Sequence, residues 1–231
     1  MAKTNIIENL FSYLAIYSAF LPILFFVLNW KKCRELRPLW VIVLYAFFVD
    51  FLISYAVDFV PHKPLKISLY ACFTFFEYLA FAYFIFLQVK RKAFKKFMLF
   101  ASAVFLVFII SYYLTVKFRN IDSIPIGFET ILILIFSFYY LYEEMNDSST
   151  LFIYSKYTFW VIIGIVLYLA GSFFIYIFAG SFLTKTEIRE YWFITNIFTI
   201  IKNIFFCIGI LIHTKPSKNK LNYHLDLSSL N

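Results

Sequence analysis

The sequence is poor in the residues that interrupt helices and in those that bind metal ions. It contains only five glycines, six prolines, three cysteines and three histidines among 231 residues. Cys33, Cys72 and Cys207 form no pair with metal-ligand spacing, so we expect neither a disulfide framework nor a zinc site. The histidines fall in expected loops or near the C-terminal end. We therefore predict no metal site and no cofactor.

Catalytic motifs are missing as well. No His-x-x-x-His, Gly-x-Ser-x-Gly or paired-aspartate pattern lies in an apolar run, and no glycine-rich nucleotide loop occurs. We therefore expect that the protein is not an enzyme. Charged residues make up only 15% of the chain, whereas soluble domains are about a quarter charged. The net charge of +8 is then explained by loops beside a membrane, and no nucleic-acid partner is expected.

Long apolar runs dominate what is present. Hydrophobic residues make up 63% of the chain and come in blocks of about 20, the length of a membrane-spanning helix. We predict an all-α, polytopic membrane protein with a single bundle of seven transmembrane helices in residues 1–213. Residues 214–231 would form a short polar cytoplasmic tail. The expected spans are Asn9–Trp30, Leu39–Val60, Leu65–Gln88, Phe97–Val116, Ile124–Tyr142, Tyr157–Leu183 and Glu190–Ile212.

Basic residues in the connections predict the orientation. Thirteen Lys and Arg fall on one side of the expected spans and seven on the other, and the loops 31–37 and 90–96 decide the difference. Because cytoplasmic loops are enriched in Lys and Arg, we expect the N-terminus outside and the C-terminus in the cytoplasm. The same two loops could instead form a docking surface for anionic lipid or an acidic partner.

Few residues could break a span. Transporters with discontinuous helices usually interrupt them with Gly and Pro. Here only Pro22 and Pro125 stand where they could do so. The sequence therefore favours a transporter less than other multi-pass proteins.

Four charged residues fall inside the expected spans. Lys202 lies near the middle of the seventh, and Asp50, Glu77 and Glu129 lie in the second, third and fifth. A charge at the centre of a bilayer is costly, so these side chains should face the bundle interior and pair with one another. A helical turn of 100° per residue aligns further polar residues with them. The resulting faces are Asp50, Ser54 and Asp58; Tyr70, Thr74 and Glu77; Tyr168, Ser172 and Tyr176; and Thr195, Asn196, Thr199, Lys202 and Asn203.

Depth supports pairing between these spans. Glu77 and Lys202 each lie about 18 Å from the expected outer end of their helix, and Asp50 lies about 15 Å in. We expect Lys202 to pair with Glu77 or Asp50, and Glu129 to extend the site outward. The candidate ligand-binding or ion-pair pocket comprises Asp50, Glu77, Glu129, Lys202, Asn196, Asn203, Tyr168 and Ser172.

Two interpretations of this cluster stay open. A buried ion pair could simply fix helix order and rotation. Alternatively, the excess of three acids over one base could leave a carboxyl group free to titrate or to bind a small ligand. A retinal Schiff base at Lys202 is disfavoured, because microbial rhodopsins carry an acidic residue or Asn one turn earlier and Phe198 stands there.

Four stretches, taken together, resemble a known family. They are Phe75–Phe81, Phe128–Leu134, Phe159–Ser172 and Ile200–Phe205. Their order is similar to that of an uncharacterised family of seven-span inner-membrane proteins of the Bacteroidota, over roughly residues 40–212. The resemblance adds weight to Glu77, Glu129, Trp160, Lys202 and Asn203 and supplies no catalytic residue.

The resemblance also implies a role, because proteins of that family are often encoded beside sensor histidine kinases or response regulators. The expected localisation is the bacterial inner membrane. We expect a sensory or signal-relay module whose polar pocket binds a small ligand, lipid or proton, and which acts through a membrane or cytoplasmic signalling protein. The alternatives are a small proton-coupled transporter or permease and a structural subunit of a membrane complex.

Overall fold

The expected all-α architecture is confirmed for the part of the chain that the structure describes. A computed structural model describes the backbone of residues 2–60, 63–115, 123–147, 152–179 and 185–215. It describes the side chains of residues 10–57, 60, 65–66, 68–115, 124–147, 152–175 and 193–215. These ranges contain helices and connections without strands, and seven helical stretches are long and apolar enough to cross a membrane.

Each expected span corresponds to one of these stretches. Three of them are subdivided or extended relative to the expectation, as described below. The elements are α1 (Ala2–Ser18), α2 (Phe20–Leu28), α3 (Trp30–Cys33), α4 (Arg37–Tyr45), η1 (Ala46–Ile53), α5 (Ser54–Phe59), α6 (Lys63–Gln88), α7 (Lys92–Thr115), α8 (Ser123–Met145), η2 (Ile153–Ser155), α9 (Tyr157–Ala179) and α10 (Lys185–Thr214).

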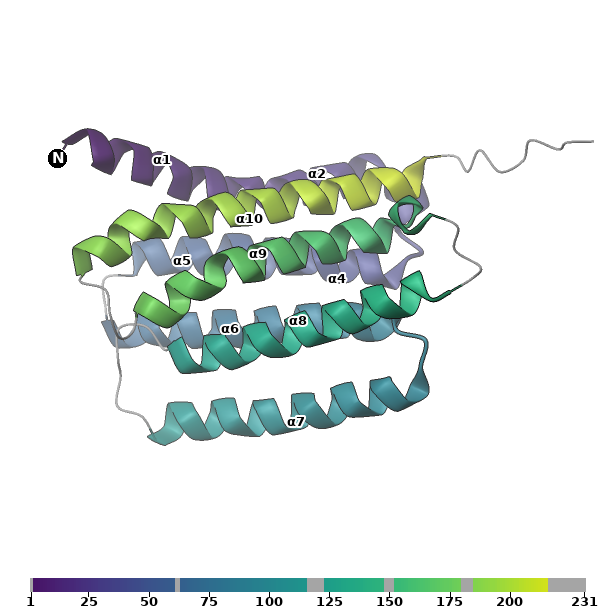
Figure 1. Cartoon of the computed structure of the whole chain (residues 1–231). Coiled ribbons are helices and arrows are strands. Elements are labelled where there is room, and N and C mark those ends of the chain that lie inside the picture. Colours follow the sequence, from purple (N-terminus) through teal and green to yellow (C-terminus); the bar gives the residue numbers. More distant parts are fainter. Residues whose placement is uncertain (1, 61–62, 116–122, 148–151, 180–184, 216–231) are drawn as a thin grey trace, which may run out of the picture.

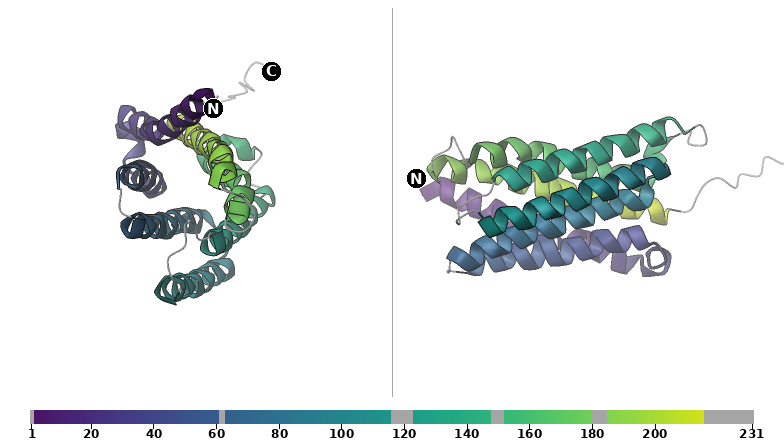
Figure 2. Two further views of the ribbon diagram at one scale, coloured as in Figure 1. Left: turned by 90° about the vertical axis from the view of Figure 1, so that its left-hand side faces the viewer. Right: turned by 90° about the horizontal axis from the view of Figure 1, so that it is seen from below.

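The long helices lie side by side along one common direction (Figure 1). Seen end on in Figure 2, α2, α4, α6, α8, α9 and α10 surround a shared interior, and α7 lies outside this arrangement against α6 and α8. Helix α7 is also the least buried of the candidate spans. The interior between the other helices is therefore where a polar site would be shielded most completely.

The first span is interrupted where a proline predicts it. Helix α1 ends at Ser18 and α2 begins at Phe20, so that Pro22 lies in the first turn of α2. Proline has no N–H to donate to the carbonyl four residues earlier, here that of Ser18, and its ring crowds that carbonyl. Pro125 does not interrupt a span, because it lies in the first turn of α8, where a missing N–H costs little.

The second span departs most from a regular α-helix. Between α4 and α5 the eight residues of η1 form a π-helix, which contains Asp50. Of the face predicted to contain Asp50 and Ser54, Asp50 is buried and Ser54 is half-buried, and the Ser54 hydroxyl donates to Val49 O in η1, 3.5 Å away. The side chain of Asp58, expected on the same face, lies outside the described residues, as does that of Tyr176 in the sixth span.

Two expected loops are shorter than predicted. Helix α7 begins at Lys92 and α8 continues to Met145, so part of the basic loop 90–96 and the start of the acidic loop 143–156 are helical. The Glu143 carboxylate accepts hydrogen bonds from the backbone N–H groups of Lys90 (2.7 Å) and Arg91 (2.8 Å). Such groups before a helix have no partner within it, and Glu143 supplies one. Of the expected tail, residues 216–231 lie outside the described part.

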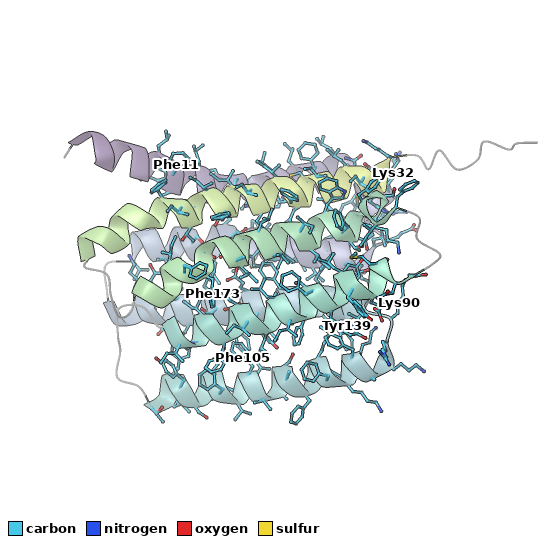
Figure 3. All side chains as sticks on the ribbon, viewed as in Figure 1. Phe11, Lys32, Lys90, Phe105, Tyr139 and Phe173 are labelled. Atoms are coloured by element: carbon cyan, nitrogen blue, oxygen red, sulfur yellow. The ribbon has the colours of Figure 1, made fainter. Side chains whose placement is uncertain are left out.

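Helices α9 and α10 share the most extensive contact between described helices. A Cβ added at Gly164 would lie 2.7 Å from Cβ of Phe205 and 3.3 Å from the carbonyl oxygen of Lys202. Glycine therefore lets α9 approach the backbone of α10 beside its buried lysine. Side chains fill the space between the ribbons in Figure 3. That view also places Lys32 and Lys90 at the same end of the bundle.

Candidate functional site

Lys202 is enclosed completely by the bundle. Its side chain is 0% exposed and projects from the candidate span Phe193–Thr214 of α10. The Nζ atom lies 2.9 Å from Oδ1 of Asp50, whose side chain is 2% exposed, and donates a hydrogen bond to it. The structure thus pairs Lys202 directly with Asp50 rather than with Glu77. The pair ties η1 to α10 across 152 residues of sequence.

Tyr45 connects this ion pair to Glu77. The Lys202 ammonium donates to the Tyr45 hydroxyl at 2.6 Å, and that hydroxyl donates to Oε1 of Glu77 at 2.7 Å. Tyr45 and Glu77 are both buried. A continuous chain of hydrogen bonds therefore runs from Asp50 through Lys202 and Tyr45 to Glu77. Tyr45 was not among the residues that the sequence pointed to.

Aromatic rings complete the surroundings of the ammonium group. Nζ of Lys202 lies 4.2 Å from the ring centroid of Tyr168, 4.6 Å from that of Tyr45 and 5.9 Å from that of Phe81. The face of an aromatic ring carries negative charge density, which attracts a cation. The Tyr168 side chain also lies close enough to Glu77 to interact with it. Tyr168, a predicted site residue, therefore contacts both the base and one of the acids.

Glu129 is buried but does not join the hydrogen-bond chain. It is 1% exposed, and neither carboxyl oxygen has a hydrogen-bond partner among the described residues. It lies close enough to Glu77 and Tyr78 to interact with them electrostatically. Glu129 therefore lies next to Glu77 at the edge of the site, without a hydrogen bond to it. The second oxygen of Asp50, Oδ2, is also without a described partner.

The remaining predicted site residues lie around this core without hydrogen bonds to it. Asn203, fully buried beside Lys202, donates through Nδ2 to Ser18 Oγ at 2.8 Å and so contacts α1. Ser172 donates to the carbonyl oxygen of Tyr168 within its own helix, at 2.6 Å. Asn196 is half-buried, one turn and a half before Lys202 on α10. Asn203, next to Lys202 in the chain, and Ser172, which contacts Tyr168, therefore border the network.

A second charged cluster, which the sequence did not indicate, lies at the end of the bundle near Lys90. Buried Glu144 accepts from Lys90 at 2.9 Å and from Lys156, and Lys90 also binds Asp147. Hydrogen bonds to Asp147 and Glu144 raise the pKa of Lys90 above its ordinary value of 10.5. The cluster holds the connections before α7 and after α8 together. Its members are too far apart in sequence for helical spacing to have revealed it.

The same end of the bundle fixes the end of α10. Lys32 donates to the carbonyl oxygen of Thr214 at 2.7 Å, and Nε2 of His213 lies 3.2 Å from the carbonyl oxygen of Lys32. Helix α10 is thus anchored at Thr214 and contacts Asp50 in its middle.

The side chains of the site are one lysine, neighbouring carboxyl groups and tyrosines. Among the described residues no three His, Cys, Asp or Glu side chains gather as metal ligands would. Lys202 has carboxylate and aromatic partners. Glu77 accepts a hydrogen bond from the Tyr45 hydroxyl, whereas the hydrogen-bond partner of Asp50 is the Lys202 ammonium. Comparison of the chain with protein-family models, curated proteins and solved structures finds no match.

Proposed function

We propose that the protein is a multi-pass membrane sensor or signal-relay module, whose buried network of Asp50, Tyr45, Lys202 and Glu77 changes partners when a ligand or proton binds. One observation supports this most strongly. The fully buried Lys202 ammonium binds Asp50 directly and reaches Glu77 through a single tyrosine hydroxyl. Two acids thus compete for one base through a short, defined path.

The cost of charge burial makes such a network sensitive. A buried ion that loses its partner is destabilising by several kcal/mol, so any event that alters one acid favours a different arrangement of Lys202. The aromatic rings around Nζ allow the ammonium to remain buried during such an exchange. An event at Asp50 or Glu77 is therefore coupled to the position of α10.

The output surface in this proposal is the basic end of the bundle. Thr214 lies 12 residues beyond Lys202, about 18 Å along the helix axis. There α10 contacts Lys32, and the neighbouring cluster of Lys90, Glu144, Asp147 and Lys156 holds the next connection. Basic residues favour the cytoplasmic side, so this end would face a cytoplasmic or membrane-bound signalling partner at the inner membrane of a bacterium.

The test isolates the tagged protein gently from native membranes and identifies what accompanies it by mass spectrometry. It compares the wild type with Lys202→Met and with Leu114→Ala, a control at an exposed residue near the opposite end of α7. We expect one signalling protein at near-equal amount, whose activity differs between wild type and Lys202→Met but not in the control. A partner that is indifferent to Lys202→Met would indicate a structural subunit instead.

One observation favours a second candidate, a small proton-coupled transporter. The π-helix η1 interrupts the second span at Asp50, and irregular helices beside buried charges occur in secondary transporters and at functional sites. Purified protein in liposomes would then acidify or alkalinise the lumen when a substrate gradient is imposed. The sensor proposal predicts no such flux, and an Asp50→Asn variant controls for leakage.

A further inference from the structure

Glu129 is the buried acid that the network described above does not use. It is 1% exposed, and both of its oxygens are without a hydrogen-bond partner among the described residues. An ionised carboxylate needs hydrogen bonds or a counter-ion when it leaves water, whereas a neutral carboxylic acid costs far less to bury. The environment of Glu129 therefore matches a protonated side chain.

Among the described residues no cation remains to balance Glu129. The one described positive charge near it belongs to Lys202, which lies 2.9 Å from Asp50 and is joined to Glu77 through Tyr45. Glu77 and Glu129 lie close enough to interact electrostatically. Two neighbouring carboxylates that share no second cation do not both ionise, because like charges repel strongly in a medium of low dielectric constant.

The groups that face Glu129 within the described part of the chain offer no other partner. Helix α8 packs against α6, α7 and α9. The charged and titratable groups near Glu129 come from α6, as Glu77 and Tyr78, and the Tyr78 hydroxyl donates elsewhere, to Ser102 Oγ at 2.7 Å. Neither Phe97–Thr115 of α7 nor Tyr157–Ala179 of α9 contains a charged residue.

We propose that Glu129 is a proton-binding site within the bundle, that Glu129 and Glu77 together hold one proton in the resting state, and that this proton is the ligand to which the network responds. The last clause rests on the proposed function, whereas the proton site itself does not. In binding, a proton from water forms an O–H bond with the Glu129 carboxylate and neutralises its charge. A sodium ion is a poorer fit, because Ser137, the next unpartnered hydroxyl on α8, lies eight residues or about 12 Å away.

Loss of this proton would change the partner of Lys202. Ionised Glu129 adds a second negative charge beside Glu77, and the combined charge attracts the ammonium away from Asp50. The path is short, since the Tyr45 hydroxyl lies 2.6 Å from Nζ and 2.7 Å from Oε1 of Glu77. Movement of Lys202 along this path displaces the middle of α10, whose end is held by Lys32 at Thr214.

Infrared difference spectroscopy of the purified, lipid-reconstituted protein tests the proposal. The wild type should show the carbonyl band of a protonated carboxylic acid at neutral pH. Glu129→Gln should lose that band, and Glu129→Asp should restore it at a shifted frequency. Glu144→Gln is the matched control, because Glu144 is a buried acid of the same helix that is paired with two lysines, and this variant should keep the wild-type band.

Three outcomes would overturn the proton site. They are a wild type without the band, a Glu129→Gln variant that is folded by size-exclusion chromatography and keeps it, and a carboxylate signal at Glu129 that appears only with sodium. The infrared measurement needs no partner protein. If the band is present while Glu129→Gln leaves the activity of the isolated partner unchanged, the proton site holds and the proposed signalling function fails.

Discussion

Tyr45 and Asp50 are five residues apart, yet both contact the same atom, Nζ of Lys202, at 2.6 and 2.9 Å. In an α-helix, residues five apart point in directions about 140° apart, which would place one of them away from the lysine. The π-helix that begins at Ala46 removes this conflict, because its hydrogen bonds join residues five apart. The local distortion of the second span is therefore what assembles the network.

Removal of one hydroxyl should disconnect the network. Tyr45→Phe takes away the acceptor for Lys202 and the donor for Glu77 while the ring over Nζ remains. A buried polar group that loses its partner costs about 1–3 kcal/mol, so we expect the free energy of unfolding to fall by that amount. Reversible unfolding of the purified protein in bicelles measures it. The control is Tyr83→Phe on the exposed side of α6, and an equal effect at Tyr83 would contradict the assignment.

Enlargement of a glycine should separate α9 from α10. A Cβ added at Gly209 would lie 2.8 Å from Cγ2 of Val161 and 3.1 Å from the carbonyl oxygen of Tyr157. Overpacking of this kind costs about 1–3 kcal/mol, so we expect Gly209→Ala to unfold at a lower temperature than the wild type. Ala170→Leu, on the exposed side of α9, should be close to neutral. A neutral Gly209→Ala would show that the two helices adjust freely.

The sequence predicted the helices and the buried acids well, because each is a property of one helix. An apolar run of about 20 residues forms a transmembrane helix in a bilayer, and a charged side chain within it must face the bundle interior whatever its partner. Lys202, Asp50, Glu77 and Glu129 all proved to be buried for this reason. The direct partner of Lys202 stayed open between Asp50 and Glu77, since depth alone does not give the rotation of a helix.

The parts that the sequence did not predict depend on several elements at once. Tyr45 was not predicted as a site residue, because its spacing of five residues from Asp50 does not place the two on one face of an α-helix. The sequence of the run Ala46–Ile53 does not indicate a π-helix. The cluster of Lys90, Glu144 and Lys156 depends on how two connections meet at the end of α8. The Glu143 carboxylate accepts from the backbone N–H groups just before α7. This cap explains why α7 begins earlier than its hydropathy suggests and includes basic residues in its first turns.

The charged cluster at the end of the bundle should depend on pH in a defined direction. The pKa of Lys90 is raised by Asp147 and Glu144, so its stabilising effect is fully present below the ordinary value of 10.5 and is lost as the pH rises through the higher value in the folded protein. Lys90→Met should therefore lower the unfolding temperature slightly and equally at neutral and mildly alkaline pH. The effect should be small, because half of the lysine side chain is exposed.

Exposed Lys92 provides the control for that measurement, since Lys92→Met should leave the unfolding temperature unchanged throughout the pH series. A difference in unfolding temperature between Lys90→Met and the wild type that grows as the pH rises above 10.5 would contradict a raised pKa of Lys90. Added salt should shrink the difference at every pH, because exposed pairs are screened.

Cys33 should react slowly with thiol reagents. It is 0% exposed, and burial raises the pKa of its thiol above the ordinary 9.0, against the opposing charge of Lys32. Since the thiolate is the nucleophile, we expect alkylation by a water-soluble maleimide at least about tenfold slower than at Glu35→Cys, an exposed neighbour. Peptide mass spectrometry follows both sites. The control rate should reach half of its maximum near pH 9, whereas Cys33 should reach half of its own at a higher pH, and equal rates would contradict its burial.

The most direct test of the account is a double-mutant cycle on Asp50 and Lys202. Removal of either partner leaves an uncompensated buried charge, so Asp50→Asn and Lys202→Met should each lower the free energy of unfolding by about 3–5 kcal/mol. The double variant leaves neither charge of the pair and should be more stable than the sum of the two losses by at least about 1 kcal/mol. Strictly additive losses would show that Lys202 and Asp50 are not partners, and would contradict the network on which the proposed relay depends.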